Sequence, residues 1–169
     1  MNVSGVLFDD CANGSGIRIT IFVSGCKHKC RGCHNKETWD FKNGEPFNID
    51  MQTAIFNKIA NSEYIEGITL SGGDPMYHAE ELLFFVKKYR QLFPEKTLWL
   101  YTGFTFEEIK EDSAKWKLAK ECDVIVDGPF KIKEIDNSVS FRGSLNQRII
   151  DVNESIASKS IIIWDPTYY

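Results

Sequence analysis

The chain has to fold around three cysteines that fall within eight residues, directly after a segment with the pattern of a β-strand. That segment, residues 17–23, alternates in polarity and then becomes continuously apolar. Cys26, Cys30 and Cys33 follow it at the spacing C-x3-C-x2-C. Thiolates are soft donors that suit iron–sulfur clusters or zinc, so we expect this loop to bind metal.

The number of cysteines indicates a reducing compartment. The chain has five, and an odd number fits poorly with a disulfide framework. The first residues lack the basic and long apolar stretches of a targeting signal, and no apolar run approaches the roughly 20 residues that cross a bilayer. We expect a cytoplasmic protein without a membrane partner, in which Cys11 and Cys122 are bystanders.

Composition and charge argue for one globular domain that does not bind nucleic acid. A length of 169 residues, of which 43% are hydrophobic, suits a single domain over residues 1–169. The formal net charge is −4, whereas a general nucleic-acid binder needs a surplus of Lys and Arg to neutralise phosphates. We therefore expect no nucleic-acid partner.

Strand and helix patterns alternate along the chain. Asp50 is a candidate N-cap for a first helix, and an apolar stripe over residues 82–93 predicts a second. Thr105 and Glu108 form a candidate capping box for a third helix that continues through Leu118. The further predicted strands are residues 67–70, 98–101, 124–126, 148–152 and 160–164.

This alternation predicts an α/β fold, either a partial (β/α) barrel or an open, mostly parallel sheet with helical crossovers. A complete eight-fold barrel typically needs about 250 residues, more than this chain has. In both predicted forms the site lies at the carboxyl ends of the strands. The cysteine loop and the segment Ser71-Gly72-Gly73-Asp74-Pro75 each follow a strand, so both are expected at that edge.

Three thiolates without a fourth cysteine nearby could bind three irons of a cubane cluster and leave the fourth iron open. An open position lets a substrate bind the metal directly, as it does at catalytic zinc sites. Lys27, Lys29 and Arg31 flank the cysteines, and we expect their charges to favour the thiolate form and to ease electron entry. The alternative is that they are solvated loop charges.

Two other interpretations of the cysteine loop stay open on the residues alone. The cysteines could form a zinc site whose fourth ligand is His28, His34 or His78. They could also pack as three unligated thiols. Ligand softness and spacing favour an iron–sulfur cluster over both.

The spacing C-x3-C-x2-C resembles the signature of the radical S-adenosylmethionine (radical SAM) enzymes. Asn13-Gly14-Ser15-Gly16-Ile17-Arg18 and Gly25-Cys26 are similar to the entry sequence of its glycyl-radical-enzyme activases. Further segments resemble one branch of these activases, the anaerobic ribonucleoside-triphosphate reductase-activating proteins, and the resemblance covers about residues 13–152. These segments are Gly32-Cys33-His34-Asn35-Lys36-Glu37-Thr38-Trp39, Leu70-Ser71-Gly72-Gly73-Asp74-Pro75, Tyr101-Thr102-Gly103, Asp127-Gly128-Pro129, Phe141-Arg142-Gly143-Ser144 and Asn146-Gln147-Arg148.

The resemblance implies two cofactors and the residues that hold them. Cys26, Cys30 and Cys33 would bind one [4Fe–4S] cluster, and S-adenosylmethionine would chelate the fourth iron. The implied cofactor-binding residues are Gly32, Cys33, His34, Ser71, Gly72, Gly73, Asp74, Tyr101 and Arg142. The wider superfamily often has an aromatic residue in place of Gly32 and Glu in place of Asp74, but the branch allows both departures.

On the residues alone, several of these side chains also have structural interpretations. The pair Gly72-Gly73 could be an ordinary tight turn, which Asp74 would only shape. Tyr101 could be a core aromatic residue. Arg142 and Arg148 could bind the cofactor carboxylate or a partner, or form internal salt bridges.

The resemblance implies an oxidoreductase that acts as an activating enzyme. A flavodoxin-like donor would reduce the cluster, cleavage of S-adenosylmethionine would give a 5′-deoxyadenosyl radical, and this radical would take a hydrogen atom from a glycine of the reductase large subunit. No side chain here is expected to act as acid or base. The alternatives are activation of another glycyl-radical enzyme such as pyruvate formate-lyase, a cluster-containing electron-transfer protein, and a zinc-stabilised binding module.

Overall fold

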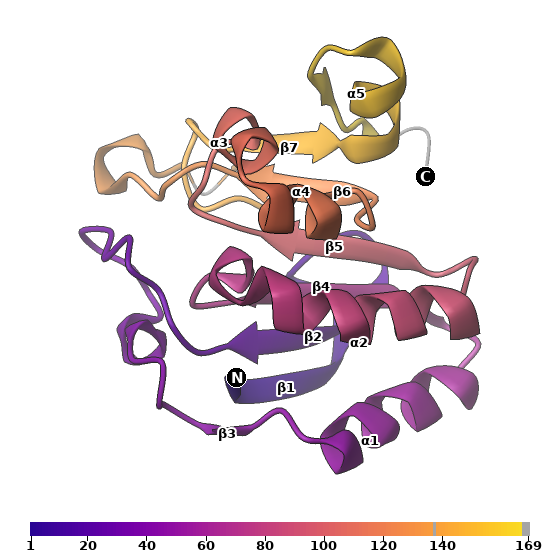
Figure 1. Ribbon diagram of the computed structural model, residues 1–169. Coiled ribbons are helices and arrows are strands. Elements are labelled where there is room, and N and C mark those ends of the chain that lie inside the picture. Colours follow the sequence, from indigo (N-terminus) through magenta and orange to yellow (C-terminus); the bar gives the residue numbers. More distant parts are fainter. Residues whose placement is uncertain (137, 167–169) are drawn as a thin grey trace.

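One open sheet of eight strands runs through residues 1–136 and 138–166, which are the residues that this computed structural model describes (Figure 1). The strands are β1 (Asn2–Asp10), β2 (Ile17–Val23), β3 (Glu45–Pro46), β4 (Ile65–Gly72), β5 (Thr97–Tyr101), β6 (Val124–Asp127), β7 (Arg148–Asp151) and β8 (Ile162–Ile163). Their order in the sheet is β3-β1-β2-β4-β5-β6-β7-β8, so β3 and β8 form its edges.

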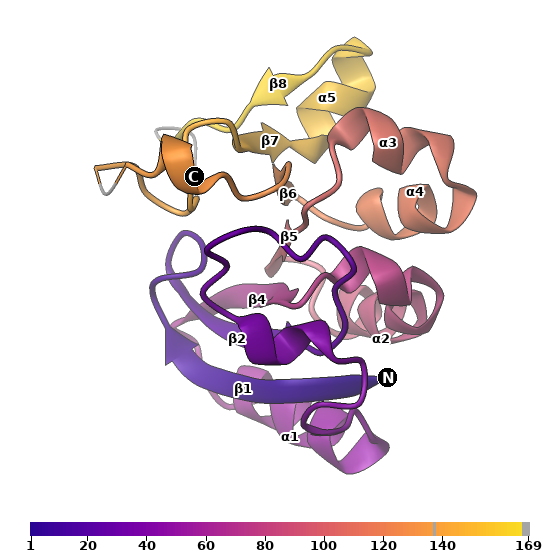
Figure 2. The same cartoon turned by 90° about the vertical axis from the view of Figure 1, so that its left-hand side faces the viewer.

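Helices cover one side of the sheet. In the described residues the α-helices are α1 (Ile49–Ala60), α2 (Ala79–Leu92), α3 (Phe106–Glu111), α4 (Ser113–Ala119) and α5 (Val152–Ser158), and the 3-10 helices are η1 (Lys36–Trp39), η2 (Pro75–His78) and η3 (Ile132–Glu134). Helices α1 to α4 lie on the same side, and segments 11–16 and 128–136 lie on the other (Figure 2). No helix in this part of the chain has the length and apolar character that a bilayer crossing requires.

The sheet is mixed, which corrects the expected mostly parallel arrangement. The central pairs β2–β4, β4–β5 and β5–β6 are parallel, and the pairs outside them are antiparallel. Parallel neighbours need a crossover of about a dozen residues or more, usually a helix. Residues 11–16 are too few for such a crossover between β1 and β2. Between β6 and β7 the described residues hold only the short η3, so the chain stays at one edge and returns in the opposite direction.

Most of the predicted elements are present. Strand β2 has the predicted bounds, the predicted strands at residues 67–70, 98–101 and 124–126 are β4, β5 and β6, and the apolar stripe lies on α2. The capping box is confirmed, because the hydroxyl of Thr105 accepts from the amide of Glu108 at 3.3 Å and the carboxylate of Glu108 accepts from the amide of Thr105 at 2.7 Å.

Three helix boundaries differ from the prediction, each because of one polar side chain. Asn48, not Asp50, caps α1, and its side chain accepts a hydrogen bond from an amide of the first turn at 3.0 Å. Asp112 accepts from two amides of α4, so the helix predicted from Thr105 onward is broken into α3 and α4. Asp151 caps α5, which therefore begins where the strand predicted over 148–152 was to continue.

The sheet margins were the least predictable part of the fold. Strand β1 was not predicted, because Gly5 interrupts its apolar alternation. Its pairing with β2 is also irregular, with two register shifts. Strand β3 is only two residues long and polar in part. The strand predicted over residues 160–164 is reduced to β8.

The core between sheet and helices fixes the strands whose ends carry the site. Ile19, Ile21 and Val23 of β2 are fully buried. Phe56 of α1 and Phe85 of α2 stack with their ring centroids 5.2 Å apart. Burial of one such side chain contributes about 1.5–3 kcal/mol relative to its exposure, so packing rather than local propensity holds the helices against the sheet.

A buried arginine stabilises the opposite side of the sheet. Arg18 is 1% exposed, and burial lowers its pKa to about 10, so it stays charged at neutral pH. Its guanidinium donates five hydrogen bonds, of 2.8–3.1 Å, to Ser15, Ile68, Thr69 and Thr97. The hydroxyl of Thr69 in turn donates to the carbonyl of Asn13 at 2.7 Å. Arg18 and Thr69 thereby hold the loop between β1 and β2 against strands β4 and β5.

We expect Arg18→Met to lower the free energy of unfolding by about 3 kcal/mol, because it leaves buried acceptors without donors. The free energy of unfolding of Arg18→Lys should lie between those of the parent protein and of Arg18→Met, since an ammonium group has three donors instead of five. The measurement is urea unfolding of the metal-free protein. Lys87→Ala, at an exposed position of α2, should change the same quantity by less than about 0.5 kcal/mol. An equally small change in Arg18→Met would contradict the stabilising role.

Candidate functional site

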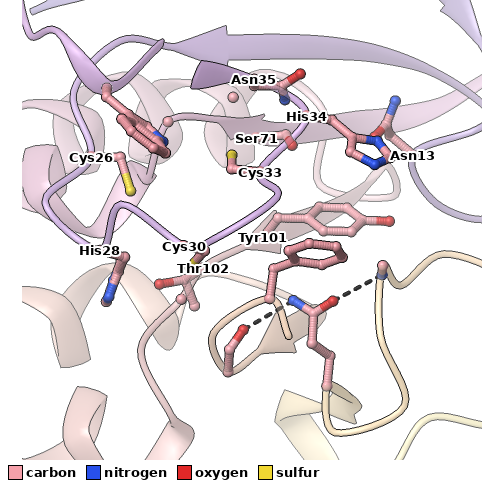
Figure 3. Close-up of a pocket in the computed structure, with 18 residues that line it drawn as sticks. Asn13, Cys26, His28, Cys30, Cys33, His34, Asn35, Ser71, Tyr101 and Thr102 are labelled. Atoms are coloured by element: carbon pink, nitrogen blue, oxygen red, sulfur yellow. Dashed lines mark hydrogen bonds between the residues drawn. The ribbon is translucent and has the colours of Figure 1, made fainter. Parts of the chain in front are cut away.

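Four parallel strands end side by side, and the loops after them surround a cavity of about 310 Å³ (Figure 3). Residues that follow β2, β4, β5 and β6 line it, and residues before β7 complete it. The cysteine loop and the Gly-Gly-Asp-Pro segment therefore meet at the carboxyl edge of the sheet, as their positions after strands predicted.

The cavity brings together most of the predicted site residues. It is lined by Cys26, Cys30, Cys33, His34, Ser71, Gly72, Gly73 and Tyr101. Gly32, Asp74 and Arg142 lie outside its lining. In Figure 3 the sulfur atoms of the three cysteines lie on one side of the cavity and the Tyr101 hydroxyl lies on the other.

The cysteine loop is supported at both ends by backbone hydrogen bonds. The amides of Gly25 and Cys26 donate to carbonyl groups of η1 at 2.7 and 3.2 Å. The amide of Cys33 donates to the carbonyl of Cys30 at 3.1 Å, which closes a turn between the second and third cysteines. The fold thus directs three thiols that are close in sequence into one cavity.

Burial raises the pKa of the Cys26 and Cys30 thiols, and hydrogen bonding from backbone amides only partly offsets it. Lys27, Lys29 and Arg31 are exposed, so water screens their charges, which favours the interpretation that they are solvated loop charges. Metal coordination can still deprotonate the thiols.

The two glycines at the end of β4 are required by the neighbouring backbone. Gly72, the last residue of β4, has a φ of +98°, and a Cβ there would lie 2.6 Å from the backbone nitrogen of Val23 in β2. A Cβ on Gly73 would lie 2.6 Å from the carbonyl oxygen of Gly25, at the start of the cysteine loop. The close backbone approach predicted for this pair is therefore in the first place an approach to β2 and to the loop after it. Both glycines also expose their backbone to the cavity.

Asp74 is fully buried behind the cavity, where it binds three chain segments. Its carboxylate accepts hydrogen bonds, each of 2.9 Å, from the ring of His28, the amide of Met76, the hydroxyl of Thr102 and the amide of Gly103. Of the two interpretations of Asp74, the geometry supports the one in which it shapes the loops.

Two buried polar atoms at the cavity have no hydrogen-bond partner among the described residues. They are the hydroxyl of Tyr101 and the indole nitrogen of Trp39, and both residues line the cavity. Burial raises the pKa of Tyr101 far above its ordinary value, so its hydroxyl is a neutral donor. Since buried polar groups are nearly always paired, a ligand with acceptor atoms fits this cavity.

Gln147 builds the wall opposite the cysteine loop. Its side-chain amide donates to the carbonyl of Gly128 at 3.0 Å and accepts from the amide of Gly143 at 2.8 Å (dashed in Figure 3). Phe130 lines the cavity from the same wall, with its ring centroid 5.9 Å from that of His34. Both ends of the segment between β6 and β7, which shows no periodicity in the sequence, thus contribute residues to the site.

Gly32 and Arg142 act outside the cavity. Gly32 has a φ of +81°, and a Cβ there would lie 2.5 Å from the end of the Ile132 side chain, so this position packs against the opposite wall. Arg142 donates to the carbonyl of Gln147 at 2.9 Å and stabilises that wall from behind.

Arg148 forms internal salt bridges, which was the structural interpretation of this side chain. Its guanidinium lies 2.5 Å from the carboxylate of Asp127 and 2.8 Å from that of Glu107. Hydrogen bonding from Arg148 lowers the pKa of Glu107 to about 2. The arginine therefore connects β7 to the end of β6 and to α3.

Ten lining residues were not among the predicted cofactor contacts. They are Asn13, His28, Asn35, Trp39, Thr102, Gly103, Gly128, Phe130, Gly143 and Gln147. Thr102, Gly103 and Gly128 directly follow predicted strands, so the expected position of the site at the strand ends was a usable signal. The loops that carry the others fold back over the sheet edge, and no sequence periodicity predicts that.

The donor set of the cavity suits an iron–sulfur cluster. The three cysteines form no disulfide. Within residues 1–136 and 138–166, no three His, Cys, Asp or Glu side chains are grouped as ligands of a single ion. In a cubane cluster each thiolate binds its own iron, so the three sulfur atoms need only line one cavity of sufficient size.

Known proteins match most of the chain. The family described as a 4Fe-4S single cluster domain matches residues 12–150. The anaerobic ribonucleoside-triphosphate reductase-activating protein of Pasteurella multocida (strain Pm70) is 42% identical over 143 residues, which are 83% of this chain and 90% of that protein. The protein of the same name from Enterobacteria phage T4 is 40% identical over 151 residues, or 88% of this chain and 93% of the relative.

A third relative agrees with the first two. The anaerobic ribonucleoside-triphosphate reductase-activating protein of Escherichia coli (strain K12) is 39% identical over 141 residues, which are 82% of this chain and 90% of the relative. The matched region includes all three cysteines of the cavity and the segment after β4. The chain belongs to the family of anaerobic ribonucleoside-triphosphate reductase-activating proteins and contains its [4Fe–4S] single-cluster domain.

Proposed function

We propose that this chain activates an anaerobic ribonucleoside-triphosphate reductase by radical chemistry with a [4Fe–4S] cluster and S-adenosylmethionine. The observation that carries the proposal is one cavity in which three cysteines face the ends of β4 and β5. When bound, the cluster would supply the electron that cleaves S-adenosylmethionine to methionine and a 5′-deoxyadenosyl radical, which would end as 5′-deoxyadenosine after taking a hydrogen atom from a backbone glycine of the reductase large subunit. The relatives are named for that reductase, and a flavodoxin-like protein is the proposed electron donor.

Cys26, Cys30 and Cys33 would hold the cluster, with one thiolate on each of three irons. The fourth iron then has no protein ligand and offers its position to S-adenosylmethionine. Because burial raises the pKa of two of these thiols, assembly of the cluster has to release protons. The protein supplies orientation and shielding, and no acid or base is needed.

The remaining walls of the cavity suit the parts of S-adenosylmethionine. The backbone of Ser71-Gly72-Gly73 is exposed to the cavity and would hold the amino group. The Tyr101 hydroxyl is a buried donor that would bind an oxygen of the ligand. The rings of His34 and Phe130 lie at the wall where they would pack against the adenine.

The wall formed by residues 128–136 and 138–147 would face the reductase. Ile132, Ile135 and Leu145 on this segment are each more than two-fifths exposed. Coverage of these side chains by the partner would exclude water and oxygen from the cavity. In this proposal the chain acts as a single radical SAM domain that is built on the open mixed sheet.

The first test replaces a cluster ligand. Cys30→Ala, reconstituted anaerobically with iron and sulfide, should lose the visible absorption of the cluster and the production of 5′-deoxyadenosine, because two thiolates cannot retain a cubane that three would hold. The parent protein, mixed with the reductase, S-adenosylmethionine and a reductant, should give the doublet of a glycyl radical by electron paramagnetic resonance.

Cys11→Ala is the matched control, because Cys11 is exposed and lies outside the cavity. It should retain both the absorption and the product. If Cys30→Ala retained them as well, the ligand assignment would be wrong. A glycyl radical that formed on pyruvate formate-lyase but not on the reductase would instead assign the chain to a different substrate.

The second test removes the unpaired hydroxyl. Tyr101→Phe should leave the stability of the metal-free protein unchanged or slightly higher, because the hydroxyl has no partner among the described residues. Its affinity for S-adenosylmethionine should fall by about 1 kcal/mol, or roughly fivefold, through the loss of one hydrogen bond. Thermal unfolding and equilibrium dialysis measure the two effects. Reduced stability with unchanged affinity would show that the hydroxyl has a structural role only.

A further inference from the structure

Three loops of the site are joined by one buried carboxylate. Asp74 follows β4 and binds the His28 ring in the loop after β2. It also binds the hydroxyl of Thr102 and the amide of Gly103, which follow β5. Hydrogen bonds to an ionised carboxylate are stronger than those between neutral groups, and this carboxylate is fully buried. The positions of the three loops relative to one another therefore depend on Asp74.

Asp74 restrains Cys26 from both sides. Its backbone amide donates to the carbonyl of Gly25 at 3.0 Å, immediately before the cysteine. Its carboxylate lies 2.9 Å from Nε2 of His28, two residues after the cysteine. The first contact joins two backbone groups and does not depend on the side chain at position 28. The second contact requires the imidazole ring of His28.

The His28 ring has a fixed orientation in this contact. It packs edge-to-face against Phe104, with the centroids 4.6 Å apart, and lies 5.6 Å from the ring of Tyr77. A Cβ on Gly103 would lie only 2.7 Å from Cδ2 of His28, so a glycine is needed for the loop after β5 to reach the ring. The ring is thus enclosed by the loops after β4 and β5.

The neighbouring residues of the cysteine loop have few restraints of this kind. Lys27, Lys29 and Arg31 are exposed. Lys29 also adopts a φ of +49°, a left-handed conformation that is unfavourable for a side chain with a Cβ. The contact of the His28 ring with the buried Asp74 connects this part of the loop to the interior of the protein.

We infer that His28 is a positioning residue, which through Asp74 fixes the cysteine loop against Gly72-Gly73 so that the cluster and S-adenosylmethionine would meet in one orientation. This inference rests on the proposed function. His28 acts here neither as a metal ligand nor as an acid or base. Residues that orient a metal site from outside its ligands typically change affinity or activity about 10- to 100-fold when they are replaced.

Two substitutions of His28 test the inference. His28→Ala removes the ring and its donor, whereas His28→Gln keeps a side-chain N–H that can reach Asp74. Each protein is reconstituted with iron and sulfide, reduced, and titrated with S-adenosylmethionine while the electron paramagnetic resonance spectrum of the cluster is recorded. We expect His28→Ala to contain iron but to need about tenfold more S-adenosylmethionine for the spectral change. His28→Gln should recover most of that loss.

Lys87→Gln is the control, because Lys87 is an exposed residue of α2 that lies outside the cavity and the cysteine loop. It should match the parent in the titration. Metal-free His28→Ala should still unfold cooperatively, since Asp74 keeps its other three donors. Loss of the cluster in His28→Ala, with retention in His28→Gln, would also support the inference, because loop position would then decide whether the cluster assembles.

Two results would overturn the positioning role. One is a titration midpoint of His28→Ala equal to that of a responsive parent, and the other is a loss in His28→Gln as large as in His28→Ala. If the spectrum of the parent protein did not respond to S-adenosylmethionine at all, the proposed function would fail, and the inference with it. The response of the parent therefore separates the two failures.

Discussion

The site depends on four parallel strands that end side by side at one edge of the sheet. Because β2, β4, β5 and β6 are parallel neighbours, the loops after them meet although they are far apart in the sequence. Asp74 then joins three of these loops inside the protein, with four donors at 2.9 Å. Gly73 and Gly103 permit the close approach that these hydrogen bonds require. The cavity is therefore shaped by contacts between its loops before any cofactor binds.

The sequence was sufficient to predict the central sheet but not its margins. Strands such as β2 and β4 are buried on both faces and appear as apolar runs, which a pattern search recognises. The direction of the outer strands follows from the length and path of their connections, and β1 is interrupted by Gly5 and register shifts. Helix boundaries were misplaced where an Asn or Asp side chain captured the backbone, as at Asn48 and Asp112.

The candidate site was predictable where the chemistry is local. The spacing of the cysteines and their place after a strand were enough to identify the loop that enters the cavity. Asp74 and Arg142 were expected to touch the cofactor, but both are occupied by contacts with other loops, and such contacts between distant segments leave no periodic pattern. The same reason explains why Gln147 was not among the predicted cofactor contacts, and why His28 was considered only as a candidate zinc ligand. Solvent exposure, which the sequence does not give, weakens the charges of the flanking lysines through screening by water.

The antiparallel return of β7 gives the cavity two walls that differ in construction. The wall of β4 and β5 is fixed by the buried Asp74, and its backbone is bonded directly to the cysteine loop. The wall after β6 is held by Gln147 and, at its base, by the bridge from Arg148 to Asp127, while Ile132 and Leu145 on it remain exposed. The proposed function requires both properties, because the cofactors would have to be held in a fixed orientation while a glycine of the reductase approached them. Under that proposal the mixed sheet would separate cofactor positioning from partner access, which a closed barrel with parallel strands throughout would combine at the same loops.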